Sequence, residues 1–495
     1  MNKLRIAIAA AECADLAAKG GVAEWVLGLA REELARGHDV RVLLPRYEFL
    51  ESLLPADARA HDFTVRLGLG AARPGTAVEL YLPGVTPDAP ALTVYLIDGH
   101  DGFAACRSAA EIYAAHSPER WVGFGRAVVD FLDGHEWVPD ILHCQDAHTA
   151  IIPVLLKQIR AADARSPLKR TRSVQTIHNL LEQLKLAPSI VEYAGMAASA
   201  FQEMHFEYWG EANCLKAGIR AADEVSTVSR RYAEEICSSR DFGFGLEGDL
   251  ALLRDRGRLR GIINGIDESR WSVNGFDYQQ EHAVDEMLRI KREARASLLA
   301  DWGWEDHDAL PVVSVRGRWD EGKGIRHIVE HAEEIAQSAR LLVCAWSVNA
   351  ASAAGQMWAR LGQIAAAHPD RIVVNPPALA AVDDTATHYL VSELLLMPSL
   401  YEPCGLAQQE CMRYGVLPVV SRTGGFADTV RDGESGFVFD RDDGDAMVRA
   451  VQRAVVTLAD TNRWKGMVEI AIRQKNGWAQ RFAEYEALYK SALCR

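Results

Sequence analysis

Short apolar runs, each bounded by polar or glycine-containing turns, recur along the first half of the chain. Residues 4–10 form the first run, and residues 22–36 follow with apolar side chains at helical spacing until Gly37. A second apolar run covers residues 40–44, so the opening predicts a strand, a helix and a parallel strand. Further strands are predicted at residues 93–96, 141–144, 173–176 and 224–228. This alternation is typical of a doubly wound parallel sheet.

A second alternating series begins with an apolar run at residues 311–315 and a predicted helix over residues 325–339. Between the two series, residues 267–301 are polar and charged, which indicates a domain boundary near residue 270. We therefore expect an α/β fold with domains at residues 1–270 and 271–474. An amphipathic C-terminal helix is expected within residues 475–495. The remaining strands of the second series are predicted at residues 341–345, 372–374, 394–397 and 417–420.

Composition and charge exclude several classes of partner. The formal net charge of −14 disfavours nucleic acid or an anionic membrane surface, because both need a basic footprint. The chain has no run of about 18 apolar residues, so no membrane span is predicted. The nine cysteines are scattered without a Cys-x-x-Cys pair, and the first residues lack the features of a signal peptide. We therefore expect a cytoplasmic protein with reduced thiols.

Residues 401–429 carry the most specific chemistry in the chain. Glu402 precedes a Pro-Cys-Gly turn and a short helix, and a second turn containing Gly424 opens another helix after the strand at 417–420. Both helices are expected to begin at the carboxyl end of a parallel sheet, where free N–H groups and partial positive charge favour a diphosphate. A carboxylate beside them suits sugar hydroxyls. The segment therefore predicts a site for a nucleotide sugar.

The same segment closely resembles the donor-sugar site of bacterial glycogen and starch synthases. The resemblance extends from about residue 4 to about residue 489, with landmarks in family order that include PDILHCQDAHTA (139–150), TIHN (176–179) and IINGID (262–267). It implies the GT-B fold, in which two tandem Rossmann-like domains flank a cleft and the C-terminal helix crosses back to the N-terminal domain. It also implies retaining transfer of glucose from ADP-glucose to the non-reducing end of an α-1,4-glucan, without a cofactor.

The family pattern assigns roles to five residues. Glu402 is expected to hold donor-glucose hydroxyls, and Arg318 with Lys323 to neutralise the leaving diphosphate. Here the family's Arg-Leu-x-x-Gln-Lys-Gly reads Arg-Trp-Asp-Glu-Gly-Lys-Gly. His178 is expected near the donor sugar and Asp146 on the acceptor side. The residues expected to bind the donor are Gly20, Gly21, Asn264, Cys404, Gly405, Leu406, Glu410, Thr423 and Gly424.

Several of these assignments compete with a structural alternative, and His178 could be a core or loop histidine bonded locally. Glu402 could cap the following helix, Arg318 and Lys323 could belong to a solvated basic loop, and Asp146 could be a helix N-cap. Glu410 stands where many other retaining GT-B enzymes bond the nucleotide ribose, whereas an exposed helix glutamate is an equal alternative.

Three departures from the family pattern leave the donor open. Lys19 is displaced by one position from the family's Lys-x-Gly-Gly, and residues 345–348 replace its Gly-x-Gly-Asp. The region before residues 396–399 also lacks the family's element that stacks on the base. A diverged transferase that uses another nucleotide sugar and another acceptor is therefore a second interpretation. A catalytically weak sugar-nucleotide-binding protein is a third.

The chain is expected to use no catalytic metal. Asp440-Arg441-Asp442 fits the Asp-x-Asp pattern of metal-dependent glycosyltransferases, but it lies where acidic residues cap a predicted helix. No histidine or cysteine cluster is expected to have metal-ligand spacing.

Overall fold

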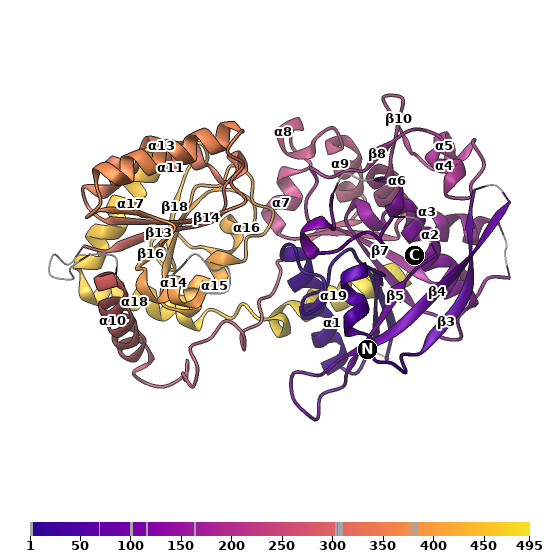
Figure 1. Cartoon of the computed structure of the whole chain (residues 1–495), viewed down its shortest axis with the longest axis horizontal. Helices are drawn as coiled ribbons and strands as arrows, with labels where there is room; N and C mark the ends of the chain where they lie inside the picture. Colours follow the sequence, from indigo (N-terminus) through magenta and orange to yellow (C-terminus); the bar gives the residue numbers. More distant parts are fainter. Residues whose placement is uncertain are drawn as a thin grey trace. The chain divides into compact units, whose positions relative to one another are not determined.

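The computed structural model divides into two compact units (Figure 1). Unit 1 contains Met1–Gly265 and Trp478–Arg495, and unit 2 contains Ile266–Gly477. The boundaries expected from the sequence, at residues 270 and 474, stand close to these limits. The structure describes residues 3–68, 70–99, 102–114, 117–162, 165–301, 304, 310–376, 379 and 385–495.

Unit 1 is built on a nine-stranded sheet, as far as its described residues show, with the order β12-β11-β7-β6-β1-β2-β5-β4-β3. Neighbouring strands from β12 to β5 are parallel, as predicted. The strands are β1 (Arg5–Ala9), β2 (Asp39–Pro45), β3 (Ala60–Leu67), β4 (Ala71–Leu82), β5 (Leu92–Ile97), β6 (Ile141–Gln145), β7 (Arg172–Ile177), β11 (Glu224–Thr227) and β12 (Leu259–Gly261), and a small separate sheet contains β8 (Lys185–Leu186), β9 (Glu207–Tyr208) and β10 (Glu211–Asn213).

The edge hairpin β3–β4 was not predicted. It pairs antiparallel within itself and with β5. Most side chains of β3 are exposed or half-buried, so its sequence lacks the continuous apolar run that marks a parallel strand.

The helices of unit 1 connect the parallel strands. The first, α1, begins directly after Gly20 and buries an apolar face that includes Trp25, Val26 and Leu29. The helices are α1 (Gly21–Ala35), α2 (Arg120–Gly134), α3 (Ile151–Ala161), α4 (Ile190–Tyr193), α5 (Ala200–Glu203), α6 (Cys214–Ala221), α7 (Arg230–Glu235), α8 (Arg240–Gly243), α9 (Glu247–Asp255) and α19 (Trp478–Leu493).

The C-terminal helix α19 completes unit 1. It lies beside α1 (Figure 1), and a Cβ atom on Gly28 would stand 1.9 Å from the indole nitrogen of Trp478. The absence of a side chain at Gly28 therefore leaves room for the Trp478 ring to pack against α1. Deeper along the contact, Trp25 donates a 2.8 Å hydrogen bond to the Tyr485 hydroxyl.

Unit 2 has a six-stranded parallel sheet within its described residues, with the order β15-β14-β13-β16-β17-β18. Figure 1 shows α11 and α13 on one side of this sheet and α15 and α18 on the other. Its strands are β13 (Val312–Arg318), β14 (Arg340–Trp346), β15 (Ile372–Val374), β16 (Leu394–Met397), β17 (Leu417–Ser421) and β18 (Phe437–Phe439), and its helices are α10 (Ala283–Asp301), α11 (Ile325–Glu330), α12 (Ala332–Ala336), α13 (Ala353–Ala367), α14 (Thr385–Val391), α15 (Ala407–Arg413), α16 (Gly424–Thr429), α17 (Gly444–Ala459) and α18 (Thr461–Arg473).

Two features of unit 2 differ from the sequence prediction. The helix predicted over residues 325–339 is two helices, α11 and α12, which are separated at His331. The apolar spacing stays in register through this break, so periodicity alone does not reveal it. The polar stretch at 267–301 contains the long helix α10, where the ammonium of Lys291 is buried and donates to the carbonyls of Tyr389 and Ser392.

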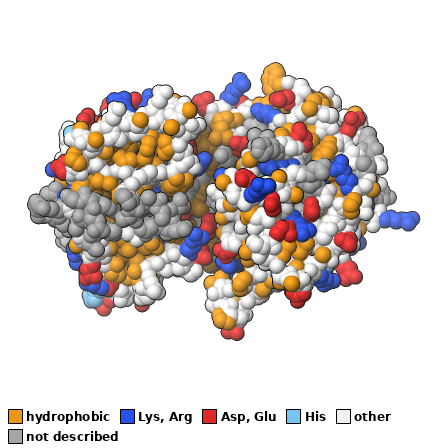
Figure 2. All heavy atoms as spheres, viewed as in Figure 1, with side chains coloured by type: hydrophobic (Ala, Val, Ile, Leu, Met, Phe, Trp, Pro, Cys, Tyr) orange, Lys and Arg blue, Asp and Glu red, His pale blue; other side chains and the backbone are white. Residues whose placement is uncertain are grey.

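The surface carries charges of both signs. On the face seen in Figure 2, Lys and Arg side chains are interspersed with Asp and Glu. None of the helices in the described part of the chain is long and apolar enough to span a membrane.

Candidate active site

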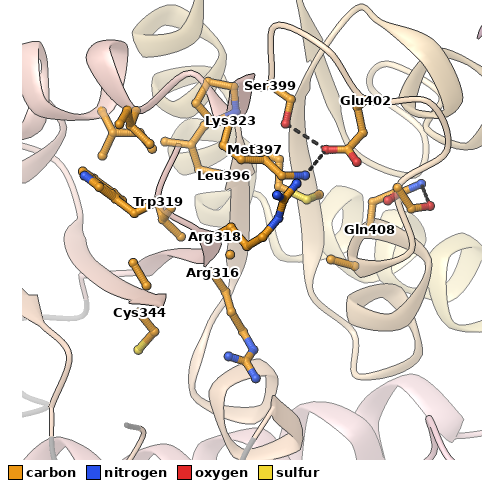
Figure 3. Close-up of a pocket in the computed structure, with 18 of the residues that line it drawn as sticks. Arg316, Arg318, Trp319, Lys323, Cys344, Leu396, Met397, Ser399, Glu402 and Gln408 are labelled. Carbon is orange, nitrogen blue, oxygen red and sulfur yellow. Dashed lines mark hydrogen bonds and ion pairs between the residues drawn. The ribbon is translucent and has the colours of Figure 1, made fainter. Parts of the chain in front are cut away.

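A pocket of about 110 Å³ lies in unit 2 at the carboxyl ends of β13 and β16 (Figure 3). The end of β13 and the following loop form one wall, and residues 396–408 form another. The carboxyl edge of a parallel sheet is where α/β folds bind their ligands. Parallel pairing of β13 with β16 thus brings two segments about 80 residues apart in the sequence to one site.

Glu402 is the central charged group of this pocket. Its Oε2 accepts a 2.6 Å charged hydrogen bond from Lys323 Nζ and a 3.0 Å hydrogen bond from Ser399 Oγ. Figure 3 shows both partners reaching the carboxylate, while Arg316 points away from it. The carboxylate bonds side chains in the pocket, whereas α15, which begins at Ala407 after the N-cap residue Leu406, has no side-chain cap. Glu402 therefore does not cap α15, and its contact with a donor sugar stays a prediction.

The Lys323 loop is held tightly against the segment that precedes Glu402. Gly324 has a φ of +68°, and a Cβ atom there would lie 1.9 Å from the Pro398 carbonyl oxygen. The Leu400 amide also donates a 2.9 Å hydrogen bond to the Gly322 carbonyl. Only glycine combines this backbone conformation with such a close approach. The loop thereby fixes where the Lys323 ammonium meets the carboxylate.

Arg318 is less constrained than Lys323. It ends β13, lies 3.6 Å from the Asp320 carboxylate and has 62% of its side chain exposed. Both predicted cations line the same pocket as Glu402. Arg318 keeps the freedom to move toward a bound anion, whereas Lys323 is already fixed on Glu402.

The glycines of the second motif are explained by close backbone packing. A Cβ atom on Gly424 would lie 1.8 Å from the Glu402 carbonyl oxygen, and one on Gly425 would lie 1.9 Å from that of Cys404. The Gly425 amide donates a 3.2 Å hydrogen bond to the Glu402 carbonyl. The start of α16 is therefore pressed onto the turn that carries Glu402. Gly405, with a φ of +67°, makes that turn possible.

Gln408 is a pocket residue to which the sequence assigns no role. Its amide nitrogen donates to the carbonyls of Cys404 and Gly405 and to Thr429 Oγ1, at 2.8–3.2 Å. Cys404 is itself buried. Gln408 thus braces the Pro-Cys-Gly turn from inside α15. The Thr423 hydroxyl is buried at the start of α16 and makes no hydrogen bond with another described residue.

Glu410 is half-buried on α15 and accepts a 3.0 Å hydrogen bond from the Tyr389 hydroxyl. Burial raises the pKa of Tyr389 well above its usual value, so this phenol stays a donor. The glutamate is therefore anchored to α14. Its predicted contact with a ribose stays a prediction.

The family's base-proximal segment is replaced by a different arrangement. Ala345 and Asn375 exchange two hydrogen bonds of 2.8 and 2.9 Å, between the backbone of Ala345 and the Asn375 side chain. The guanidinium of Arg316 stands 5.0 Å from the centre of the Trp346 ring. Part of the region in which the sequence lacks the base-stacking element, residues 380–384, lies outside the described residues.

In unit 1, Asp146 and His178 lie together at the ends of β6 and β7. Asp146 Oδ1 accepts hydrogen bonds from the amides of His178 (2.6 Å) and Asn179 (3.2 Å). Asp146 therefore does not cap the adjacent short helix, which has no side-chain cap. Burial raises the pKa of Asp146 to about 7, although these two hydrogen bonds oppose the shift.

The His178 imidazole is neutral. Burial lowers its pKa to about 3, and its Nε2 lies 2.9 Å from Gln145 Oε1. The ring packs edge-on against Trp25, with 5.0 Å between the ring centres. These contacts fix the histidine side chain within unit 1. A contact of His178 with the donor sugar would therefore be made by its backbone.

The glycine loop before α1 is already engaged by a carboxylate. Glu12 Oε2 accepts from the amides of Lys19 (2.6 Å) and Gly20 (2.7 Å), and Tyr113 donates to the other carboxylate oxygen. The Lys19 ammonium donates to the Ala110 carbonyl at 2.7 Å. A phosphate at Gly20 and Gly21 would have to compete with Glu12, which no sequence motif marks.

Asn264 follows β12 and is buried. Its neighbour Gly265 packs on the start of α19, since a Cβ atom there would lie 2.8 Å from the backbone of Trp478. The Asn-Gly turn thus has a structural reason, and the contact of Asn264 with a sugar stays a prediction.

The expectation that no histidine cluster has metal-ligand spacing is wrong. His327, Glu330 and His331 place potential ligand atoms within 4.8 Å of one another on α11 and its end. The structure shows the partners of the last residue of the Asp-x-Asp motif. Asp442 bonds Arg326 and His327, and Asp443, the residue after the motif, caps α17.

Comparison with known proteins identifies the family. A model described as the starch synthase catalytic domain matches residues 5–252, and one described as glycosyl transferases group 1 matches residues 311–456. The chain is 32% identical to glycogen synthase 2 of Geobacter sulfurreducens, with 99% of each chain covered. It is 30% identical to a glycogen synthase of Yersinia pseudotuberculosis, with 98% of this chain and 100% of the relative covered.

Two solved structures support the same conclusion about the fold. The catalytic domain of starch synthase IV from Arabidopsis thaliana, bound to ADP and acarbose, superposes with a TM-score of 0.83 at 26% identity over the full length of both chains. Sucrose-phosphate synthase from Thermosynechococcus elongatus has a TM-score of 0.60 at 18% identity, with 99% of this chain and 100% of that chain covered, and shows the fold alone. The chain therefore belongs to the glycogen and starch synthase family of glycosyltransferases and has their GT-B fold of two Rossmann-like units.

Proposed function

We propose that this enzyme transfers glucose from ADP-glucose to the non-reducing end of an α-1,4-glucan, with retention of the anomeric configuration. The observation that carries the proposal is the Glu402 carboxylate, held by Lys323 and Ser399 in the unit 2 pocket. The glycogen synthases to which the chain is similar, and the starch synthase structure bound to ADP and acarbose, support the choice of donor and acceptor.

The Lys323–Glu402 pair suits both parts of a nucleotide sugar. The ammonium has three donors, and Glu402 accepts one of them at 2.6 Å. The other two are available for a phosphate oxygen, while the second oxygen of Glu402 is available for glucose hydroxyls. As the glycosidic bond breaks, Lys323 neutralises charge on the diphosphate and Glu402 stabilises positive charge on the sugar ring.

Arg318 adds the second positive charge. Its guanidinium presents a planar fork of donors that matches phosphate oxygens, and its exposed side chain can reach a bound anion. With the positive charges of Arg318 and Lys323 beside the diphosphate, the proposed reaction needs no catalytic metal. Activity that disappeared in EDTA and returned with manganese would contradict this part of it.

In unit 1, Asp146 and His178 are proposed to serve the acceptor and the donor sugar, respectively. Asp146 keeps one oxygen, Oδ2, beyond the two backbone amides that Oδ1 accepts, and this oxygen is the group we assign to a glucan hydroxyl. A cytoplasmic location is proposed because the nine cysteines are free thiols.

The test is the release of nucleoside diphosphate from ADP-, UDP- and GDP-glucose, with and without glycogen. Release of ADP that depends on glycogen is the expected result. Turnover of another donor would assign the enzyme to the diverged class, and binding of nucleotide sugar without turnover would indicate an inactive binding protein.

Glu402→Gln tests the assigned carboxylate directly. We expect kcat to fall by orders of magnitude, because the amide cannot stabilise positive charge, while ADP binding measured by calorimetry persists. The matched control is Glu434→Gln, which changes an exposed glutamate paired with Arg431 in the same unit. Normal turnover by Glu402→Gln would refute the role.

A further inference from the structure

The end of helix α11 and the residue that follows it, His331, carry three potential metal-ligand side chains. His327, Glu330 and His331 are spaced i, i+3 and i+4, which places them side by side on a helix. One ligand atom from each lies within 4.8 Å of the others. The spacing His-x-x-Glu-His by itself is a weak signal, so the case depends on how the two rings are held.

Each histidine is oriented by a carboxylate on one of its ring nitrogens. His327 Nε2 lies 2.8 Å from Asp442 Oδ1, and His331 Nδ1 lies 3.3 Å from Glu334 Oε2. A carboxylate on one nitrogen fixes the ring and the tautomer, and it directs the other nitrogen's lone pair at a metal. This is the arrangement that supports metal-binding histidines in proteins.

The two remaining nitrogens lie near the same backbone residue. A Cβ atom on Gly444 would lie 2.2 Å from His331 Nε2 and 3.0 Å from His327 Nδ1. Both nitrogens therefore lie close to the backbone of Gly444, the first residue of α17, and a larger residue at this position would occupy the space beside the two rings. The His327 ring is buried, whereas His331 is partly exposed, so solvent can reach the site from one side.

We propose that His327 Nδ1, His331 Nε2 and the Glu330 carboxylate bind a divalent cation of the zinc class. Two imidazoles and one carboxylate suit Zn²⁺, whereas Mg²⁺ and Ca²⁺ prefer oxygen ligands. Zinc holds such ligands at about 2.0–2.2 Å, so in a tetrahedron they stand about 3.3 Å apart. Small rotations of exposed Glu330 and partly exposed His331 close the remaining distance, and water completes the coordination.

This site is distinct from the reaction centre. Ile325 and Ile328 of α11 line the donor pocket, whereas the two histidine nitrogens face Gly444 at the start of α17. A bound cation fixes the end of α11 at the His331 break and, through Asp442, the turn before α17. Its role is to stabilise unit 2, and the proposal does not depend on the identity of the sugar donor.

The test is zinc binding by the full-length enzyme after removal of metals with a chelator. A Cys494→Ser background excludes binding at the exposed thiol. Zinc is titrated in competition with a chromophoric indicator, and thermal unfolding is recorded with and without zinc. We expect one equivalent of zinc to bind and to raise the unfolding temperature.

Two ligand variants and one matched control decide the outcome. His331→Ala and Glu330→Gln should each weaken zinc binding by about tenfold or more and remove the thermal shift, because both lose a ligand. His368→Ala removes an exposed histidine that likewise pairs with a carboxylate, that of Glu333, and should bind zinc as the background does. Circular dichroism without zinc checks folding, and equal zinc affinity in all four proteins would overturn the proposal.

Discussion

At the scale of the single residue, the buried carboxyl group of Glu33 couples stability to pH. Glu33 lies fully buried on α1, where the Tyr489 hydroxyl donates to its Oε1. Burial raises its pKa to about 8, and the hydrogen bond from Tyr489 only partly opposes this shift. In the unfolded chain the pKa returns to about 4.5. Between these values the folded state binds more protons than the unfolded state, so stability is lost as pH rises.

Replacement of Glu33 by Gln is predicted to remove this pH dependence. Wild type should lose stability relative to the variant as pH rises from about 5 to 8, by an amount on the order of a few kcal/mol. Urea unfolding at several pH values measures the difference. Burial also raises the pKa of Asp146, but this residue is present in both proteins. Its contribution therefore cancels in the difference between their stabilities.

The matched control for this prediction is Glu32→Gln. Glu32 neighbours Glu33 on α1 but pairs with Arg36 nearer the surface, so its replacement should change stability by less than about 1 kcal/mol at every pH. A constant difference between wild type and Glu33→Gln from pH 5 to 8 would contradict the assigned titration.

Residues of the site differ in how far the sequence reveals them. Glu402, Lys323 and Gly424 lie in continuous motifs whose spacing carries over from the family. The motifs assign no role to Glu12 or Gln408, because these roles arise from contacts of a carboxylate or an amide with backbone groups of a turn. Such contacts depend on the folded backbone, so the spacing of residues in the sequence does not predict them.

At the scale of the element, buried strands are the most predictable part of this fold. A strand covered on both faces is mostly apolar, so β1, β6 and β17 can be predicted from short, largely apolar runs. The hairpin strand β3 and the helix α10 do not, because β3 is largely exposed and α10 buries charged groups through hydrogen bonds. Periodicity detects apolar burial, and it fails where polar groups are buried with partners.

The docking of α19 on α1 gives a prediction at this scale. Gly28→Ala should destabilise the protein by about 1–2 kcal/mol, because the added methyl group would lie 1.9 Å from Trp478 Nε1. The improved helix propensity of alanine offsets only part of this cost. Urea unfolding followed by tryptophan fluorescence measures the change.

A second glycine provides the matched control. Gly248 lies exposed on α9 of the same unit, and nothing stands within 4 Å of an added Cβ atom. Gly248→Ala should therefore gain up to about 1 kcal/mol. If both variants gained stability, the contact between Gly28 and Trp478 would not be tight.

At the scale of the whole molecule, the chain order and the units do not coincide. The last helix belongs to the first unit, so unit 1 is closed by residues that follow all of unit 2. The polar centre of this closure is a buried network in which the Tyr489 hydroxyl bonds both Glu33 and His143 Nδ1. Burial lowers the pKa of His143 to about 3, so its ring is neutral and relies on hydrogen bonds alone.

A chain that ends at Gly477 should therefore lose the fold of unit 1 while unit 2 persists. Removal of α19 exposes the apolar core around Trp25 to water and takes the Tyr489 hydroxyl away from Glu33 and His143, so unit 1 loses both apolar burial and these hydrogen bonds. Limited proteolysis with mass spectrometry should yield a resistant fragment near residues 266–477 and rapid cleavage of unit 1. A chain that ends at residue 493 keeps α19 and should resist cleavage throughout. Equal protection of unit 1 in both chains would show that its own core suffices and that α19 only covers it.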